Sequence, residues 1–152
     1  MAYDSSVETK KHISRVQEIA EGLILAIKEQ VVKHDLSKLE APEKPVFDEM
    51  TPRLKGCTYG SPEYQGFLKE MGSALKNHYE KNSHHPEHFE NGIAGMTIMD
   101  ILEMWADWKS ASERHQDGNF ERSIQINAKR FNMDPQLVSI FENTRKALYG
   151  RD

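Results

Sequence analysis

The sequence has a single cysteine, no long apolar run and no cluster of basic residues. One cysteine, Cys57, excludes an internal disulfide and any zinc site made of thiolates alone, so a metal site would have to use histidine and carboxylate ligands. No apolar segment approaches the roughly 18 residues of a membrane span, and the N-terminus lacks the apolar core of a signal peptide. We therefore expect a cytoplasmic protein without a membrane partner.

The balance of charge is mildly acidic. The chain carries 20 Lys and Arg residues against 24 Asp and Glu residues, a net charge of -4. Because binding to a nucleic-acid backbone is largely phosphate neutralisation, this balance argues against a nucleic-acid duplex as a partner. With 152 residues, 38% of them hydrophobic, the chain is large enough to bury a core. We expect one domain over residues 1–152 that binds small molecules or proteins, and a homo-oligomer is left open.

Apolar residues recur at every third or fourth position, which predicts helices, and no segment shows the alternation of a strand. Residues 41–62 contain four of the six prolines and are expected to form a long connector with one short helix over residues 46–50. Helices are expected over residues 5–34, from Ser61 to about residue 81, over 97–114, over 120–131 and over 134–148. The predicted fold is an all-α, single-domain bundle of five or six helices.

Six of the seven histidines fall into three short islands, and only His115 lies apart. The islands are His12, then His34 with Asp35, then His78 with His84, His85 and His88. Neutral imidazole and carboxylate bind Mn, Fe, Co, Ni or Zn without thiolate, and two adjacent ions need about six such groups. The chain could thus hold one or two divalent ions, with Mg also considered. In isolation, each island also has a plain structural interpretation, as a helix end, a core residue or a polar turn.

The segment 97–114 places Asp100, Glu103 and Asp107 on one helical face. Ile98 and Leu102 point nearly the opposite way, so an isolated helix would turn its acidic face to solvent. If the helix is instead packed on both sides, these carboxylates face a site. The sequence leaves both interpretations open.

The order of these residues resembles the H…HD…H…HH…D order of the HD-domain superfamily, which contains all-helical metal-dependent phosphohydrolases acting mainly on nucleotides and cyclic nucleotides. HISRV resembles its first-histidine helix, KHDLSK its HD helix, and ADWKSA the segment with its last metal-binding aspartate. The chain resembles more closely a small family of HD-like proteins from bacteria and phages, through TYGSPEY, HYEKNSHHPEHF and MDILEMWADWKSA.

This resemblance implies a metal-dependent phosphohydrolase that cleaves a phosphate ester or anhydride of a (deoxy)nucleotide. A divalent ion lowers the pKa of its water toward 7 for attack on phosphorus. The implied metal ligands are His12, His34, Asp35, His78, His84, His85 and Asp107. Asp35, Glu103 and His85 are the implied catalytic groups, and Lys38, Lys109 and Arg114 the phosphate-binding cations.

Two other functions are compatible with the same residues. Some HD-like proteins use this ligand set for a di-iron site that activates oxygen. A non-enzymatic module that binds a nucleotide or a protein would use the histidines structurally. Bound iron with an absorption band would favour the first, and the absence of bound metal the second.

The spacing between His12 and His34 conflicts with this resemblance. In one straight helix these residues would lie about 33 Å apart at 1.5 Å per residue, too far to share an ion. The superfamily architecture therefore predicts a bend or turn between Ala20 and Gln30. Local propensity favours one continuous helix, because Gly22 is the only breaker and costs only about 1 kcal/mol. A continuous helix would make Asp100 or Glu103 the replacement carboxylate.

Overall fold

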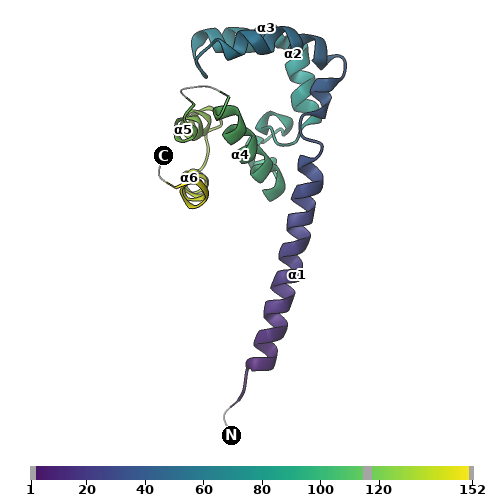
Figure 1. The fold of residues 1–152 in the computed structure, drawn as a ribbon, viewed down its shortest axis with the longest axis vertical. Helices are drawn as coiled ribbons and strands as arrows, with labels where there is room; N and C mark the ends of the chain where they lie inside the picture. Colours follow the sequence, from purple (N-terminus) through teal and green to yellow (C-terminus); the bar gives the residue numbers. More distant parts are fainter. Residues whose placement is uncertain (1–2, 115–117, 151–152) are drawn as a thin grey trace. The chain divides into compact units, whose positions relative to one another are not determined.

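A computed structural model describes residues 3–114 and 118–150 of the chain. These residues form six α-helices and three short 3-10 helices (η), with no strand among them, which confirms the all-α prediction (Figure 1). The helices are α1 Ser6–Val31, η1 Leu36–Leu39, α2 Glu43–Lys55, α3 Pro62–Lys81, η2 Pro86–His88, η3 Gly92–Gly95, α4 Ile98–Ser112, α5 Phe120–Arg130 and α6 Pro135–Tyr149. No helix in these described ranges is long and apolar enough to cross a membrane.

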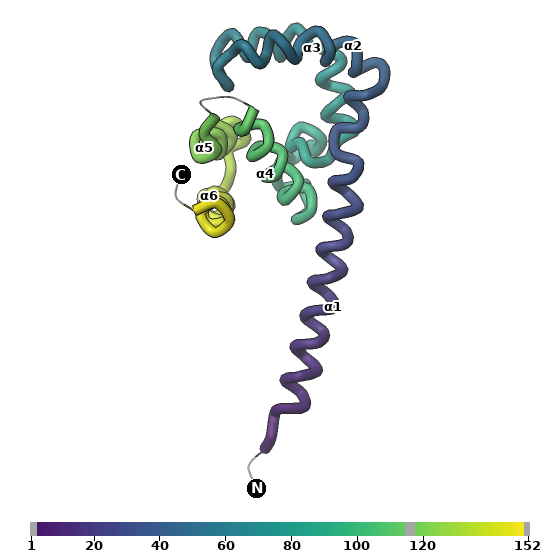
Figure 2. The backbone as a smooth tube through the Cα atoms, viewed as in Figure 1, coloured from purple at the N-terminus to yellow at the C-terminus, as the bar shows by residue number. Residues whose placement is uncertain are grey.

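The chain divides into two compact units, residues 1–34 and residues 35–152. The first unit contains the single helix α1, which runs without interruption for 26 residues (Figure 2). The predicted bend between Ala20 and Gln30 is therefore wrong, because Gly22 alone does not break a helix whose neighbours all favour it. His12 lies about 28 Å along the axis from Val31, the last residue of α1. The prediction that His12 and His34 of one chain share an ion is also wrong.

The second unit has its hydrophobic core among α4, α5 and α6, which contact one another in chain order. Trp105 and Trp108 of α4 pack against Phe120 and Ile124 of α5 and Phe141 of α6, and all five are buried. The Trp105 and Phe120 rings meet edge to face at 4.9 Å between centroids. This core holds one face of α4 in place and leaves its opposite face for the site.

The structure corrects the prediction for the connector at residues 41–62. Instead of one short helix, residues 43–55 form the 13-residue helix α2, which packs beside α3 (Figure 1). Two of the prolines, Pro42 and Pro45, lie at the helix start, where the first backbone N–H groups have no intrahelical acceptor. Proline there costs the helix little, so the proline count was a misleading signal.

Capping residues set the starts of α3 and α4 as predicted. The Ser61 hydroxyl accepts a hydrogen bond from the backbone N–H of Tyr64 at 3.1 Å. Thr97 and Asp100 form a reciprocal capping box at the start of α4. The acidic face of α4 is buried rather than solvated: Asp100 and Glu103 are each 4% exposed, whereas Ile98 on the other face is 63% exposed.

Candidate metal centre

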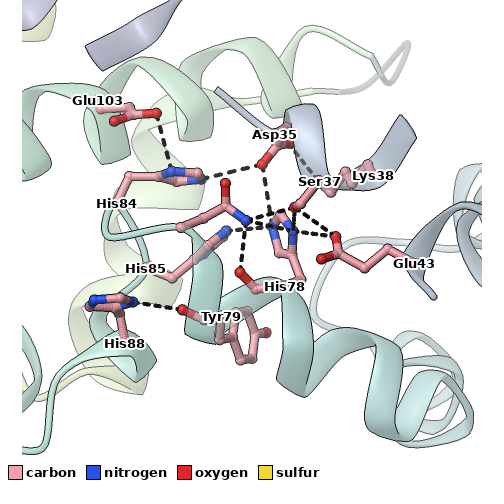
Figure 3. A network of polar contacts seen from close by, with 11 residues as sticks. Asp35, Ser37, Lys38, Glu43, His78, Tyr79, His84, His85, His88 and Glu103 are labelled. Carbon is pink, nitrogen blue, oxygen red and sulfur yellow. Dashed lines mark hydrogen bonds and ion pairs between the residues drawn. The ribbon is translucent and has the colours of Figure 1, made fainter. Parts of the chain in front are cut away.

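Four of the predicted ligands come together in the second unit: Asp35, His78, His84 and His85 (Figure 3). Asp35 precedes η1, His78 lies on the last two turns of α3, and the two other histidines follow in the segment between α3 and η2. Each residue offers one ligand atom, and all four atoms lie within 4.8 Å of one another. Asp35 from the second island and three histidines from the third, more than 40 residues further along the chain, therefore form one cluster.

The distances within the cluster match those between ligands of a single ion. His78 Nε2 lies 3.3 Å from Asp35 Oδ1 and 2.9 Å from His85 Nε2, and His84 Nε2 lies 3.5 Å from the same Asp35 oxygen. Ligands held about 2.1 Å from a metal are separated by about 3.0 Å in an octahedron and about 3.4 Å in a tetrahedron. The donor atoms thus fit a divalent transition metal in type and in spacing.

Buried carboxylates hold the other nitrogens of two of these histidines. His78 Nδ1 lies 2.9 Å from Glu43 Oε2, and His84 Nδ1 lies 3.2 Å from Glu103 Oε1. A carboxylate that accepts the Nδ1 proton fixes the tautomer in which Nε2 carries the lone pair. Both carboxylates therefore direct an Nε2 lone pair toward Asp35, which is the tautomer that a metal ligand requires.

A polar network supports the His78–Glu43 pair (Figure 3). The Ser37 hydroxyl donates to Glu43 Oε2 at 2.9 Å. The Asn82 amide donates to Ser37 Oγ at 2.9 Å and to the His78 carbonyl at 2.7 Å. Glu43 is 0% exposed and His78 is 1% exposed. The network ties η1, α2 and the end of α3 around one imidazole.

Asp35 adopts a left-handed backbone conformation, with φ 57° and ψ 13°. Aspartate tolerates this region better than most residues, and strained backbone of this kind is frequent at functional sites. Its second oxygen, Oδ2, forms an ion pair with Lys38 Nζ at 2.5 Å, and Lys38 also lies over the Phe47 ring. The turn thus presents Oδ1 to the histidines while Lys38 holds Oδ2.

Burial sets the protonation state of two histidines. Desolvation, followed by the neighbouring His84 and His78, lowers the pKa of His85 to about 2. Desolvation also lowers the pKa of His78, with Lys38 as the next cause, and this outweighs the opposing effect of Asp35 and Glu43. Both imidazoles are therefore neutral near pH 7, the form that coordinates a metal.

The cluster opens into a cavity of about 300 Å³, which lies between the α2–α3 pair on one side and α4 and α5 on the other. His78, His85 and Asp107 line it, together with Lys38 and Arg114. This volume is at the lower end of the range for small-molecule sites. A ligand in the cavity would reach the histidine cluster directly.

Other predicted site residues have different surroundings. Asp100 caps the N-terminus of α4 and accepts a hydrogen bond from Ser83 at 2.5 Å, so it is not the carboxylate that replaces His12. Glu103, the other candidate for that role, contacts the cluster through His84. Lys109 pairs with Glu113 at 2.8 Å, lies over the Tyr149 ring, and is not part of the cavity wall.

The other four histidines are not among the four clustered residues, and His12 lies within α1. His34 is the last residue of the first unit, directly before Asp35 in the chain. His88 is exposed, and its Nδ1 donates to the Tyr79 carbonyl at 2.9 Å. His115 lies outside the described residues.

Glu43 is the main site residue that sequence reasoning missed. It lies 35 positions before His78 and in a segment predicted to be a loop, so no local pattern connected the two residues. Lys55 and Arg122, which also line the cavity, were missed because no local pattern connects them with the histidines. A signal was available for Glu43 alone, because a glutamate directly after Pro42 suits the first turn of a helix.

The fold and the cluster define an all-helical protein with a buried site of histidines and carboxylates. The chain belongs to a family described as a family of unknown function, DUF5662, whose model matches residues 1–147. No curated protein and no solved structure matches the chain.

Proposed function

We propose that this protein is a metal-dependent phosphohydrolase that cleaves a phosphate ester or anhydride of a (deoxy)nucleotide. The observation that carries the proposal is the cluster of Asp35, His78, His84 and His85, with donor atoms at ligand spacing and a cavity beside it. Two buried carboxylates orient its imidazoles, an arrangement typical of metal ligands. The resemblance to HD-domain phosphohydrolases supplies the reaction class.

The four clustered residues would hold the ion, together with His34 and Asp107 according to the resemblance. When bound, a divalent ion supplies Lewis acidity and an activated water. Glu103 and Glu43 keep His84 and His78 in the required tautomer. Lys38 neutralises Asp35 Oδ2 beside the cluster, and Arg114 adds positive charge elsewhere on the cavity wall, so that the cavity favours a phosphorylated ligand.

The test is phosphate release from a panel of nucleotides, including cyclic ones, with Mn, Co, Ni, Fe, Zn and Mg added separately. Asp35→Asn preserves a residue that tolerates the left-handed backbone and removes the ligating charge. We expect it to lower both metal occupancy and turnover, turnover by more than about 100-fold, or roughly 3 kcal/mol of transition-state stabilisation. Asp48→Asn is the matched control, since Asp48 is exposed and pairs only with Lys44 among the described residues.

Three results would contradict the proposal. Full activity of Asp35→Asn would remove Asp35 from the site. Bound iron with a visible absorption band, without phosphate release, would favour the di-iron oxygenase. Less than about half an equivalent of metal after reconstitution would favour a binding module.

A further inference from the structure

The wall of the cavity is basic, although the chain as a whole is acidic. Its lining includes five Lys and Arg side chains and only two carboxylates, in a protein of net charge -4. Two of the five are already paired, Lys38 with Asp35 and Arg130 with Glu87. The other three are Lys55, Arg114 and Arg122. None of these three has a carboxylate within ion-pair distance among the described residues.

These three cations line the same cavity as the histidines, and Lys55 lies far from them along α2. Glu43, which holds His78, opens α2 and Lys55 closes it, so their backbones are separated by about 18 Å along the helix. Arg114 lies seven residues beyond Asp107, just past the end of α4, and Arg122 is in the first turn of α5. The cavity therefore has the histidine cluster near the start of α2 and the uncompensated charge of Lys55 at the end of α2, with Arg114 and Arg122 also on its wall.

Another part of the cavity wall is apolar and aromatic. Tyr59 and Tyr64 line it with their rings edge to face at 5.1 Å, and Leu54, Leu68 and Ile126 add aliphatic surface. The Tyr59 hydroxyl donates to Asn127 Oδ1 at 3.2 Å, which fixes the position of its ring. Aromatic side chains beside a basic groove are typical of sites where nucleobases stack between phosphate contacts.

We propose that Lys55, Arg122 and Arg114 form a second phosphate subsite, and that the substrate is a short 5′-phosphorylated oligonucleotide rather than a mononucleotide. This inference rests on the proposed function. The 5′-phosphate lies at the histidine cluster, a base lies against Tyr59 and Tyr64, and a phosphate further along the chain reaches the three cations. A mononucleotide carries its phosphate at one end and leaves the far subsite without a ligand.

The experiment measures the binding of thymidine 5′-phosphate, pTpT and pTpTpT by calorimetry to the full chain in chelator, so that no turnover occurs. We expect the affinity to rise along this series by about tenfold, the equivalent of one charge-assisted hydrogen bond. In the double variant Lys55→Gln/Arg122→Gln, the three ligands should bind equally. The matched control is Lys69→Gln/Lys129→Gln, which changes the net charge by the same amount outside the cavity wall and should keep the rise.

The outcomes separate this inference from the proposed function. Equal affinities in the wild-type chain, or a rise that persists in Lys55→Gln/Arg122→Gln, would overturn the subsite. Phosphate release from nucleotides in Mn²⁺ together with equal affinities would refute the subsite and leave the phosphohydrolase standing. A rise in affinity without phosphate release in any metal would refute the phosphohydrolase and support a site for short oligonucleotides. Because Lys55 and Arg122 are exposed at the wall, the variant should keep the helical circular dichroism spectrum of the wild-type protein.

Discussion

Replacing Glu43 by glutamine tests whether the buried carboxylates serve the metal or the fold. Glu43 accepts hydrogen bonds from His78 Nδ1 and from the Ser37 hydroxyl, each at 2.9 Å, and is 0% exposed. Glutamine retains an oxygen acceptor of nearly the same shape and removes the negative charge. The His78 tautomer can persist, but its imidazole becomes a weaker electron donor.

The expected loss of metal affinity follows from these two contacts. Removing a partner of a metal-bound histidine costs about 10- to 100-fold in affinity, or roughly 1.4 to 2.7 kcal/mol. Glu43→Gln should fall near the tenfold end because the acceptor remains, and Glu43→Ala near the hundredfold end because Nδ1 loses it. The metal-free Glu43→Gln protein should melt no lower than the wild-type protein. The Glu43 carboxylate is buried and its Oε1 has no hydrogen-bond partner among the described residues, so its charge is itself costly to the folded state.

Titration of metal-free protein with Mn²⁺ in a calorimeter, followed by thermal melts, gives both quantities. The control is Glu49→Gln on the same helix, whose side chain is 75% exposed. If Glu43→Gln binds Mn²⁺ within about twofold of the wild-type affinity, the orienting role of the carboxylate is refuted. A lower melting temperature with unchanged affinity would assign Glu43 to the fold alone.

Three further outcomes are expected. A chelator should lower the melting temperature of metal-loaded protein, because an ion at 100 times its Kd stabilises the folded state by about 2.7 kcal/mol, and equal melting curves would contradict a bound ion. Metal-free protein should lose stability as the pH falls from 7 to 5. The pKa of His85 is about 2 in the folded chain and about 6.5 in the unfolded chain, so the unfolded chain gains a proton that the folded chain does not. Denaturant titrations should show a loss of about 2 kcal/mol in the free energy of unfolding at pH 5. His12→Ala should leave the Mn²⁺ affinity unchanged, whereas His34→Ala should weaken it about 100-fold; a tenfold loss for His12→Ala would restore His12 to the site, and an unchanged affinity for His34→Ala would remove His34 from it.

Much of the fold could be predicted because its signals are local. Ser61 and Thr97 each lie within three residues of the backbone N–H that they cap, so the starts of α3 and α4 were visible in the sequence. The continuous first helix predicted over residues 5–34 is confirmed by α1, and only the bend that the resemblance implied between Ala20 and Gln30 was wrong. In α2, the prolines were interpreted as breakers, but Pro42 and Pro45 lie at the helix start, where proline is tolerated, and the helix continues through Pro52.

The candidate site was predictable only in part. The clustering of histidines identified His78, His84 and His85, because three imidazoles within eight residues are rare without a role. Whether Glu103 faces solvent or the site depends on what packs against both faces of α4, and this is a property of the tertiary structure. The position of Glu43 in a first helical turn had a local signal, but its contact with His78 had none, because that contact joins two segments 35 residues apart.

The left-handed backbone at Asp35 limits which substitutions this position can accept in evolution or in a library. Only glycine, asparagine and aspartate adopt such a conformation readily, and other residues cost roughly 1 to 2 kcal/mol. Of these three, only aspartate also provides a carboxylate to the histidines. A variant library at this position would therefore separate two selections: folding would retain three amino acids, and metal binding would retain one.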